Sequence, residues 1–154
     1  MNRWFSILIV YGQITKHKFW VSWYLSKFII NLIWRSTIHD LSKFKLDEAE
    51  GFARNLNKLK QTEYGTQAYR DLFKDIQPSV QAHYARNRHH PEHWPNGYQD
   101  MNVADLIEMI CDWSAASKRV KSGDVKGSMP LNKDRFNISE RDMILLQGIL
   151  DDIL

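Results

Sequence analysis

Apolar residues recur at three- and four-residue spacing along nearly the whole chain, a pattern typical of helices that bury one face. The 7 glycines and 4 prolines are sparse, and no alternating apolar and polar run is flanked by Asn-Gly or Asp-Gly. The pattern predicts an all-α chain arranged as a single-domain helical bundle. The expected helices cover residues 3–11, 14–33, 35–43, 47–59, 66–76, 78–89, 103–121 and 139–153.

Turn-forming and capping residues set several of the expected helix ends. Two prolines predict a loop over residues 91–101. Asn102 can cap the helix that follows, with Asp105 as its third residue in a capping box. Segment 123–137 is polar and basic, contains glycine and proline, and is expected to be a second loop. The helix over 139–153 is then expected to pack on the rest of the domain.

The apolar runs near the N-terminus are too short to cross a membrane. The run Trp4–Tyr11 is interrupted by Gly12-Gln13, and the later stretch "FIINLIW" is bounded by Lys27 and Arg35. A spanning helix needs about 20 apolar residues. No small-residue cleavage site of a signal peptide follows either run. These runs are therefore expected to be buried helix faces, with no membrane partner.

Length, charge and cysteine content narrow the classes of function. A chain of 154 residues with 44% hydrophobic residues is of single-domain size. The single Cys111 excludes an internal disulfide and a cysteine-rich zinc site, fits the cytoplasm, and is expected to be inert core packing. The net charge of +3 comes from scattered Lys and Arg, which argues against a nucleic-acid partner and is compatible with a small anionic substrate. The sequence leaves open whether the chain forms a homo-oligomer.

Histidines and aspartates form the one constellation that carries chemistry. Four of the six histidines lie between His83 and His93, while His39-Asp40 and His17 come earlier and Asp112 lies in an apolar helical run. Neutral imidazoles and carboxylates without thiolates suit Mn, Fe, Zn, Co or Ni. Each element alone has a simpler interpretation, such as a surface histidine or an adventitious metal tract. The metal hypothesis depends on their occurring together.

The residue types predict two divalent ions. Adjacent helical residues point about 100° apart, so His39 and Asp40 can bind one ion, and the second oxygen of Asp40 can bridge to another. One site would consist of His17, His39, Asp40 and Asp112, and the other of Asp40, His83 and two of His89, His90 and His93. Two divalent ions bring more positive charge than two aspartates neutralise, which favours a phosphate and a hydroxide. Metal-bound water can have its pKa lowered to about 7.

These residues resemble the HD superfamily of helical, metal-dependent phosphohydrolases. "HDLSK" is similar to the HD-x-[GS]-K element, and the H…HD…D order matches His17, His39-Asp40 and Asp112. "HHPEHWPNGY" is similar to the HHExxDGxGY element of the HD-GYP branch, with a displaced glutamate and no terminal proline. The pattern "HxxxNxHHxxHW" from His83 to Trp94 also resembles small phage and bacterial proteins. The resemblance spans about residues 14–121 and implies a bundle of the HD-domain type.

The resemblance implies roles for individual side chains. It favours His89 and His90 as the two later ligands and gives Lys43 the role of holding a substrate phosphate beside the catalytic Asp40. A salt bridge to Asp40 or Glu48 is the alternative for Lys43. Arg119 comes seven residues after Asp112 and is expected on the same helix face, where it can clamp an anion. Glu108 is a candidate partner for a ligand imidazole.

Three functions follow from this pattern. The first is hydrolysis of a nucleotide or related small phosphoester by metal-activated water. The second is oxidation by a di-iron oxygenase of the HD type, whose ligand set is similar. The third is a non-catalytic protein that binds a nucleotide or a partner. Every position of the H…HD…D order carries its ligand residue, which argues against this third function.

Overall fold

The computed structural model describes residues 3–62, 66–119 and 123–154. Within these ranges the regular structure is helical, with no strand, so the all-α prediction is confirmed. The helices are α1 (Arg3–Ile38), α2 (Leu46–Arg54), α3 (Leu56–Gln61), α4 (Gln67–Asp75), α5 (Gln77–Arg86), α6 (Val103–Ser117), α7 (Val125–Phe136) and α8 (Glu140–Ile153), with short 3-10 helices at Leu41–Phe44 (η1), Pro91–His93 (η2) and Gly97–Asp100 (η3).

The chain packs as two compact units, Met1–Ile38 and His39–Leu154. The expected single domain over the whole chain stays a prediction. None of the described helices combines the length and the apolar character needed to span a membrane.

The first unit is a single helix where the sequence predicted one helix over 3–11, a second over 14–33 and the start of a third over 35–43. α1 continues through Gly12, and the Thr15 hydroxyl donates a hydrogen bond to the Tyr11 carbonyl oxygen (2.9 Å) across this point. Glycine inside a helix costs about 1 kcal/mol, which a long run of helix-compatible residues without proline can absorb. The expected break at Gly12-Gln13 is therefore wrong.

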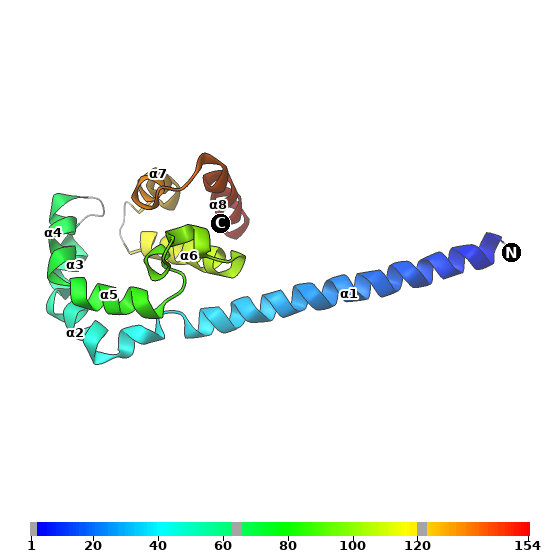
Figure 1. Cartoon of the computed structure of the whole chain (residues 1–154), viewed down its shortest axis with the longest axis horizontal. Coiled ribbons are helices and arrows are strands. Elements are labelled where there is room, and N and C mark those ends of the chain that lie inside the picture. The colour runs from blue at the N-terminus through cyan, green and yellow to red at the C-terminus, as the bar shows by residue number, and fades with distance from the viewer. Residues whose placement is uncertain (1–2, 63–65, 120–122) are drawn as a thin grey trace. The chain divides into compact units, whose positions relative to one another are not determined.

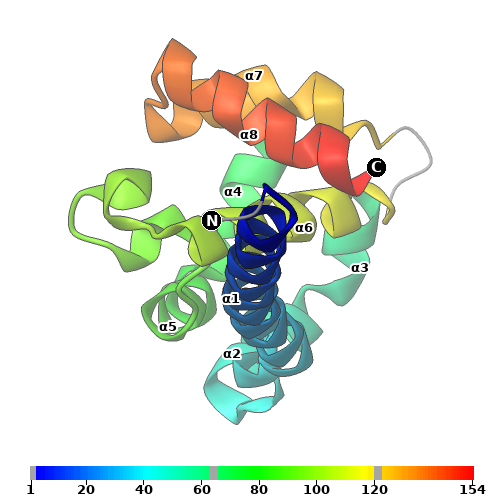
Figure 2. The ribbon, with the colours of Figure 1, turned by 90° about the vertical axis from the view of Figure 1, so that its right-hand side faces the viewer.

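The core of the second unit lies among α6, α7 and α8. Figures 1 and 2 show α7 and α8 on one side of α6, with α2 and α5 on the other. Met109 and Ile110 of α6 are buried against Leu146 and Leu150 of α8, the last of which is fully buried. Leu146 and Leu150 lie four residues apart, which places them on one face of α8.

α7 corrects the expectation of a loop over 123–137. Val125, Met129 and Asn132 lie at helical spacing and are buried, so the segment contributes one face to the core. Pro130 lies inside this helix, where a missing N–H costs about 3 kcal/mol in the absence of tertiary support. Burial of the Val125–Met129 face offsets that local preference.

The capping box at the start of α6 is confirmed, and the far end of this helix is corrected. The side chain of Asn102 accepts from the Asp105 N–H (3.0 Å), and the Asp105 carboxylate accepts from the Asn102 N–H (3.0 Å). α6 ends at Ser117 rather than near residue 121. Cys111, expected in the core, is exposed.

Close packing of α2 on α5 fixes the segments around the histidines. The Ser79 hydroxyl donates to the Asp47 carbonyl oxygen (2.7 Å) between these helices. A Cβ at Gly51 would lie only 2.2 Å from Ser79 Oγ, so the approach requires glycine. The expected helix over 47–59 is divided at Asn55 into α2 and α3.

Truncating Leu146 to alanine should lower the free energy of unfolding by about 2–5 kcal/mol, because a 1% exposed side chain is replaced by a cavity. Leu145→Ala is the control, since its side chain is 56% exposed and should cost little. Denaturant titration measures both values. Equal losses for the two variants would contradict the described core.

Candidate metal centre

His39 and Asp40 lie in the turn that follows α1, and not in the helix expected over 35–43. Asp40 has φ 58°, in the left-handed region that aspartate tolerates better than most residues. This turn brings His39 Nε2 to 3.4 Å from Asp40 Oδ2. The two side chains therefore converge as predicted, but through a left-handed backbone and not through the 100° offset of a helix.

Three further imidazoles, from two other places in the second unit, join His39. His83 is on α5, and His89 and His90 follow the end of that helix. The ring centroid of His89 is 4.4 Å from that of His39 and 4.2 Å from that of His90. His83 Nε2 lies 2.9 Å from His90 Nε2. His83 and His89 are buried.

Two carboxylates orient three of these imidazoles. Glu108 Oε1, on α6, lies 2.8 Å from His39 Nδ1 and 3.1 Å from His89 Nδ1. Glu48 Oε2, on α2, lies 2.9 Å from His83 Nδ1. A carboxylate accepts a hydrogen bond from Nδ1–H, so each of these rings carries its lone pair at Nε2 when it is neutral. All three Nε2 atoms are then available as ligands.

The Nε2 atoms surround the Asp40 carboxylate. His83 Nε2 is 3.3 Å and His89 Nε2 is 3.5 Å from Asp40 Oδ1. His39 Nε2 is also 3.6 Å from Asp112 Oδ1, on α6. Asp40 Oδ1 and His89 Nε2 are buried without a hydrogen-bond partner in the part of the chain that the structure describes. A buried acceptor without a donor is costly, and a cation between these two atoms would satisfy both.

Three groups of ligand atoms lie close enough to hold an ion. They are Asp40 with His83, His89 and His90; His39 with Asp40 and Asp112; and His39 with His89 and Glu108. The third group would use the Nδ1 atoms that face Glu108. The first two use the inward-facing Nε2 atoms and share Asp40, so they fit together as a pair.

The electrostatics of this cluster favour a cation. Asp112 and Glu108, which lie against the imidazole, raise the pKa of His39 to about 10, although burial opposes the shift. Burial and then the neighbouring His89 and His83 lower the pKa of His90 far below its usual range. His90 is therefore neutral at physiological pH, the protonation state that binds metals.

A hydrogen-bond network surrounds the Nδ1 side of the His83 ring. Glu48 is fully buried and accepts from the Ser42 hydroxyl (2.9 Å) and from Arg86 Nη1 (2.7 Å). Burial by itself raises the pKa of Glu48, but the bonds from Arg86, Ser42 and His83 outweigh it and the net pKa is lowered. The Asn87 side-chain amide lies 2.6 Å from Ser42 Oγ and 2.7 Å from the His83 carbonyl oxygen.

The remaining predicted residues have different outcomes. Lys43 forms an ion pair with Asp40 Oδ2, the alternative considered for it. Arg119 lies beyond the last residue of α6 and is exposed, so its expected place on the Asp112 face of that helix is wrong. His93 Nδ1 donates to the Tyr84 carbonyl oxygen (2.9 Å) and belongs to none of the ligand groups found among the described residues. His17 is exposed on α1, in the first unit, and its role as a ligand stays a prediction.

Sequence reasoning missed the supporting residues Ser42, Glu48 and Asn87. Glu48 follows the acidic Asp47 in an ordinary first helical turn, so its local sequence gives no sign of burial. Asn87 does carry a signal, because it lies four residues after His83 and two before His89. Glu108 was expected as a partner of one imidazole, and it contacts two.

A comparison with protein families gives one match. The sequence model of a family of unknown function, DUF5662, matches residues 8–152. The chain belongs to the DUF5662 family. The match includes every residue of the cluster, so this DUF5662 protein carries its candidate metal centre inside the region that defines the family. No curated protein and no solved structure matches it significantly.

Proposed function

We propose that this DUF5662 protein is a metal-dependent phosphohydrolase that acts on a nucleotide or a related small phosphoester. The observation that carries the proposal is the pair of buried atoms Asp40 Oδ1 and His89 Nε2, which face each other at 3.5 Å without hydrogen-bond partners among the described residues. Two acceptors at that distance are stabilised by a cation between them. The HD-like motif "HDLSK" begins with the same His39-Asp40 pair.

The cluster has places for two ions. Asp40 Oδ1, His83, His89 and His90 would hold the first, and Asp40 Oδ2, His39 and Asp112 the second. The donors are imidazole nitrogens and carboxylate oxygens, which suit Mn, Fe, Zn, Co or Ni. A pair of such ions supplies an activated water at neutral pH and electrostatic stabilisation of phosphoryl oxygens.

The residues of the chain would prepare the site for this chemistry. Glu108 and Glu48 fix the imidazoles in the orientation that ligation needs, as hydrogen-bonded carboxylates do in known metal sites. The ammonium of Lys43 lies against Asp40 and would contact a substrate phosphate at the same carboxylate. Arg119 remains a second candidate for that role, without the support of a shared helix face.

A substrate panel tests the proposal. Protein loaded with Mn²⁺ or Co²⁺ is incubated with nucleoside monophosphates and cyclic nucleotides, and release of phosphate or ring opening is measured. Hydrolysis of one class above the metal-free control is the expected result. Oxygen uptake by iron-loaded protein without phosphate release would instead indicate the di-iron oxygenase. Nucleotide binding without turnover by any metal form would indicate a binding protein.

Lys43→Ala should keep the bound metal and raise the KM for the substrate by roughly tenfold, because a charge-assisted contact to phosphate is lost while the ligand set remains. Lys45→Ala, two residues away and exposed, is the matched control. Metal content and steady-state kinetics are measured for both. Metal loss in Lys43→Ala equal to that in an Asp40 variant would contradict the role given to Lys43.

A further inference from the structure

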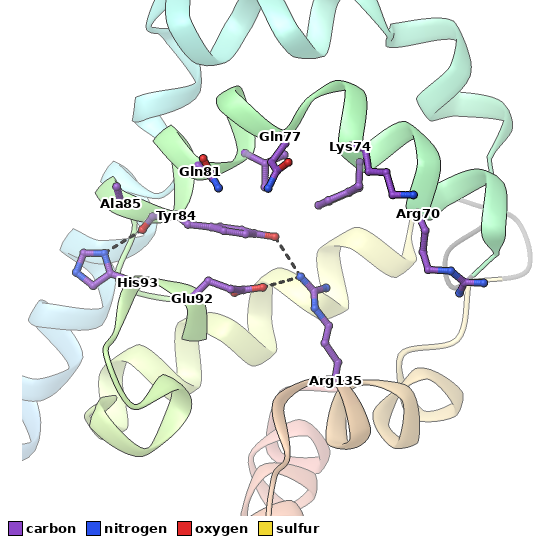
Figure 3. Close-up of a pocket in the computed structure, with 11 residues that line it drawn as sticks. Arg70, Lys74, Gln77, Gln81, Tyr84, Ala85, Glu92, His93 and Arg135 are labelled. Atoms are coloured by element: carbon purple, nitrogen blue, oxygen red, sulfur yellow. Dashed lines mark hydrogen bonds and ion pairs between the residues drawn. The ribbon is translucent and has the colours of Figure 1, made fainter.

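An open cavity of about 610 Å³ lies within the second unit, apart from the cluster ligands. Its walls come from α4, α5, η2 and α7 (Figure 3). None of the residues in the ligand groups lines it, although Tyr84 does, and its ring centroid is 4.8 Å from that of His90. A volume of this size accommodates a small-molecule ligand.

Positive charge predominates on the described lining. It contains the cations Arg70, Lys74 and Arg135, and one carboxylate, Glu92. Arg70 and Lys74 lie one helical turn apart on α4, so their side chains project from the same face. The lining therefore attracts a ligand with at least one negative charge.

Arg135 is held in place across the cavity. It extends from α7 toward Tyr84 and Glu92, as Figure 3 shows, and donates to Tyr84 Oη (3.1 Å) and to Glu92 Oε1 (2.6 Å). Burial, and then Glu92, raise the pKa of Tyr84 to about 12, so the phenol is protonated at neutral pH. A guanidinium fixed in this way holds its N–H donors in a rigid fork whose geometry matches phosphate oxygens.

The rest of the lining suits a flat ring with polar edges. Phe73 and the ring of Tyr84 provide aromatic surface from α4 and α5. Gln77 and Gln81 lie one turn apart on α5, and their amides offer both donors and acceptors (Figure 3). Aromatic rings stack on nucleobases, and glutamine amides can pair with the polar edges of these bases.

We infer that this cavity is a binding site for a mononucleotide, with its phosphate at Lys74, Arg70 and Arg135 and its base against Phe73 and Tyr84. The site is separate from the metal centre and needs no metal. Its occupant would contact the Tyr84 ring, which also packs on His90, so the occupant and a ligand of the cluster share a neighbour.

Calorimetric titration of the full chain with AMP in excess EDTA tests the site, because the chelator removes any contribution of bound metal. AMP should bind at least tenfold more tightly than adenosine, which lacks the phosphate. Lys74→Gln should weaken AMP binding by roughly fivefold or more, as should Arg135→Gln. Lys126→Gln, a cation of α7 paired with Asp151 outside the cavity, should leave it unchanged.

Lys74 is the decisive position because its side chain is 74% exposed and its replacement does not threaten the fold. No binding of AMP at millimolar concentration would overturn the inference, as would equal binding of adenosine or equal affinities of Lys74→Gln and Lys126→Gln. Since all titrations are made without metal, failure here leaves the proposed hydrolase untouched, and loss of metal binding elsewhere leaves this site untouched.

Discussion

Replacing Asp40 with asparagine should remove both metal ions and all metal-dependent activity. Asp40 belongs to both of the ligand groups assigned to the two ions, and its two oxygens face imidazole nitrogens of different groups. Asparagine tolerates the left-handed φ of 58° nearly as well as aspartate, so the turn should be retained. The loss then reports ligation and not unfolding. Elemental analysis, with circular dichroism to verify the helices, measures the effect.

Asp151→Asn is the matched control for Asp40→Asn. It makes the same chemical change at an exposed aspartate of α8 that pairs with Lys126 (2.7 Å). This variant should retain the metal content of the wild-type protein. Retention of both ions by a folded Asp40→Asn protein would contradict the bridging role of Asp40.

Replacing Glu108 with glutamine should lower metal affinity by about 10- to 100-fold without unfolding the protein. One carboxylate oxygen accepts from the Nδ1 atoms of both His39 and His89, two residues 50 positions apart in the chain. A glutamine side chain is neutral, so its single acceptor oxygen makes weaker hydrogen bonds to the two rings than the charged carboxylate does. The two imidazoles are then held less firmly in the orientation that directs their Nε2 atoms inward.

Two readouts separate this role of Glu108 from general stabilisation. Competition titration with a fluorescent chelator gives the metal affinity, and nitrogen-15 shifts of the histidine rings in the metal-free protein give their tautomers. Wild-type His89 should carry its proton on Nδ1, and Glu108→Gln should alter that signal. Glu50→Gln, an exposed i,i+4 partner of Arg54 on α2, should change neither quantity. Unchanged tautomers and metal affinity in Glu108→Gln would contradict the orienting role.

The fold could be predicted where local pattern and packing agree. α8 and the Asn102 capping box follow directly from helical periodicity and from a cap that acts within three residues. α7 could not, because Pro130 disfavours a helix locally while burial of Met129 on α6 and α8 stabilises one. Likewise, the left-handed turn at Asp40 depends on what surrounds it and not on the apolar spacing of residues 35–43.

The candidate site could be predicted in its residue types but not in its supports. The residues were identified because imidazoles and carboxylates occur together in an order that resembles the HD superfamily, and the structure brings these residues together: His39, Asp40, His83, His89, His90 and Asp112. Glu48 could not be identified, because an acidic residue early in a helix is usually solvated. Its role as a hydrogen-bond partner of His83, 35 residues away, becomes visible in the structure.

The metal content of the wild-type protein, purified without a histidine tag, tests the central claim most directly. Elemental analysis by mass spectrometry should find between one and two equivalents of transition metal per chain, with fewer in Asp40→Asn. After dialysis against Mn²⁺ or Co²⁺, the content should rise to two. A folded protein that binds no transition metal, either as purified or after dialysis, would contradict the account of the cluster.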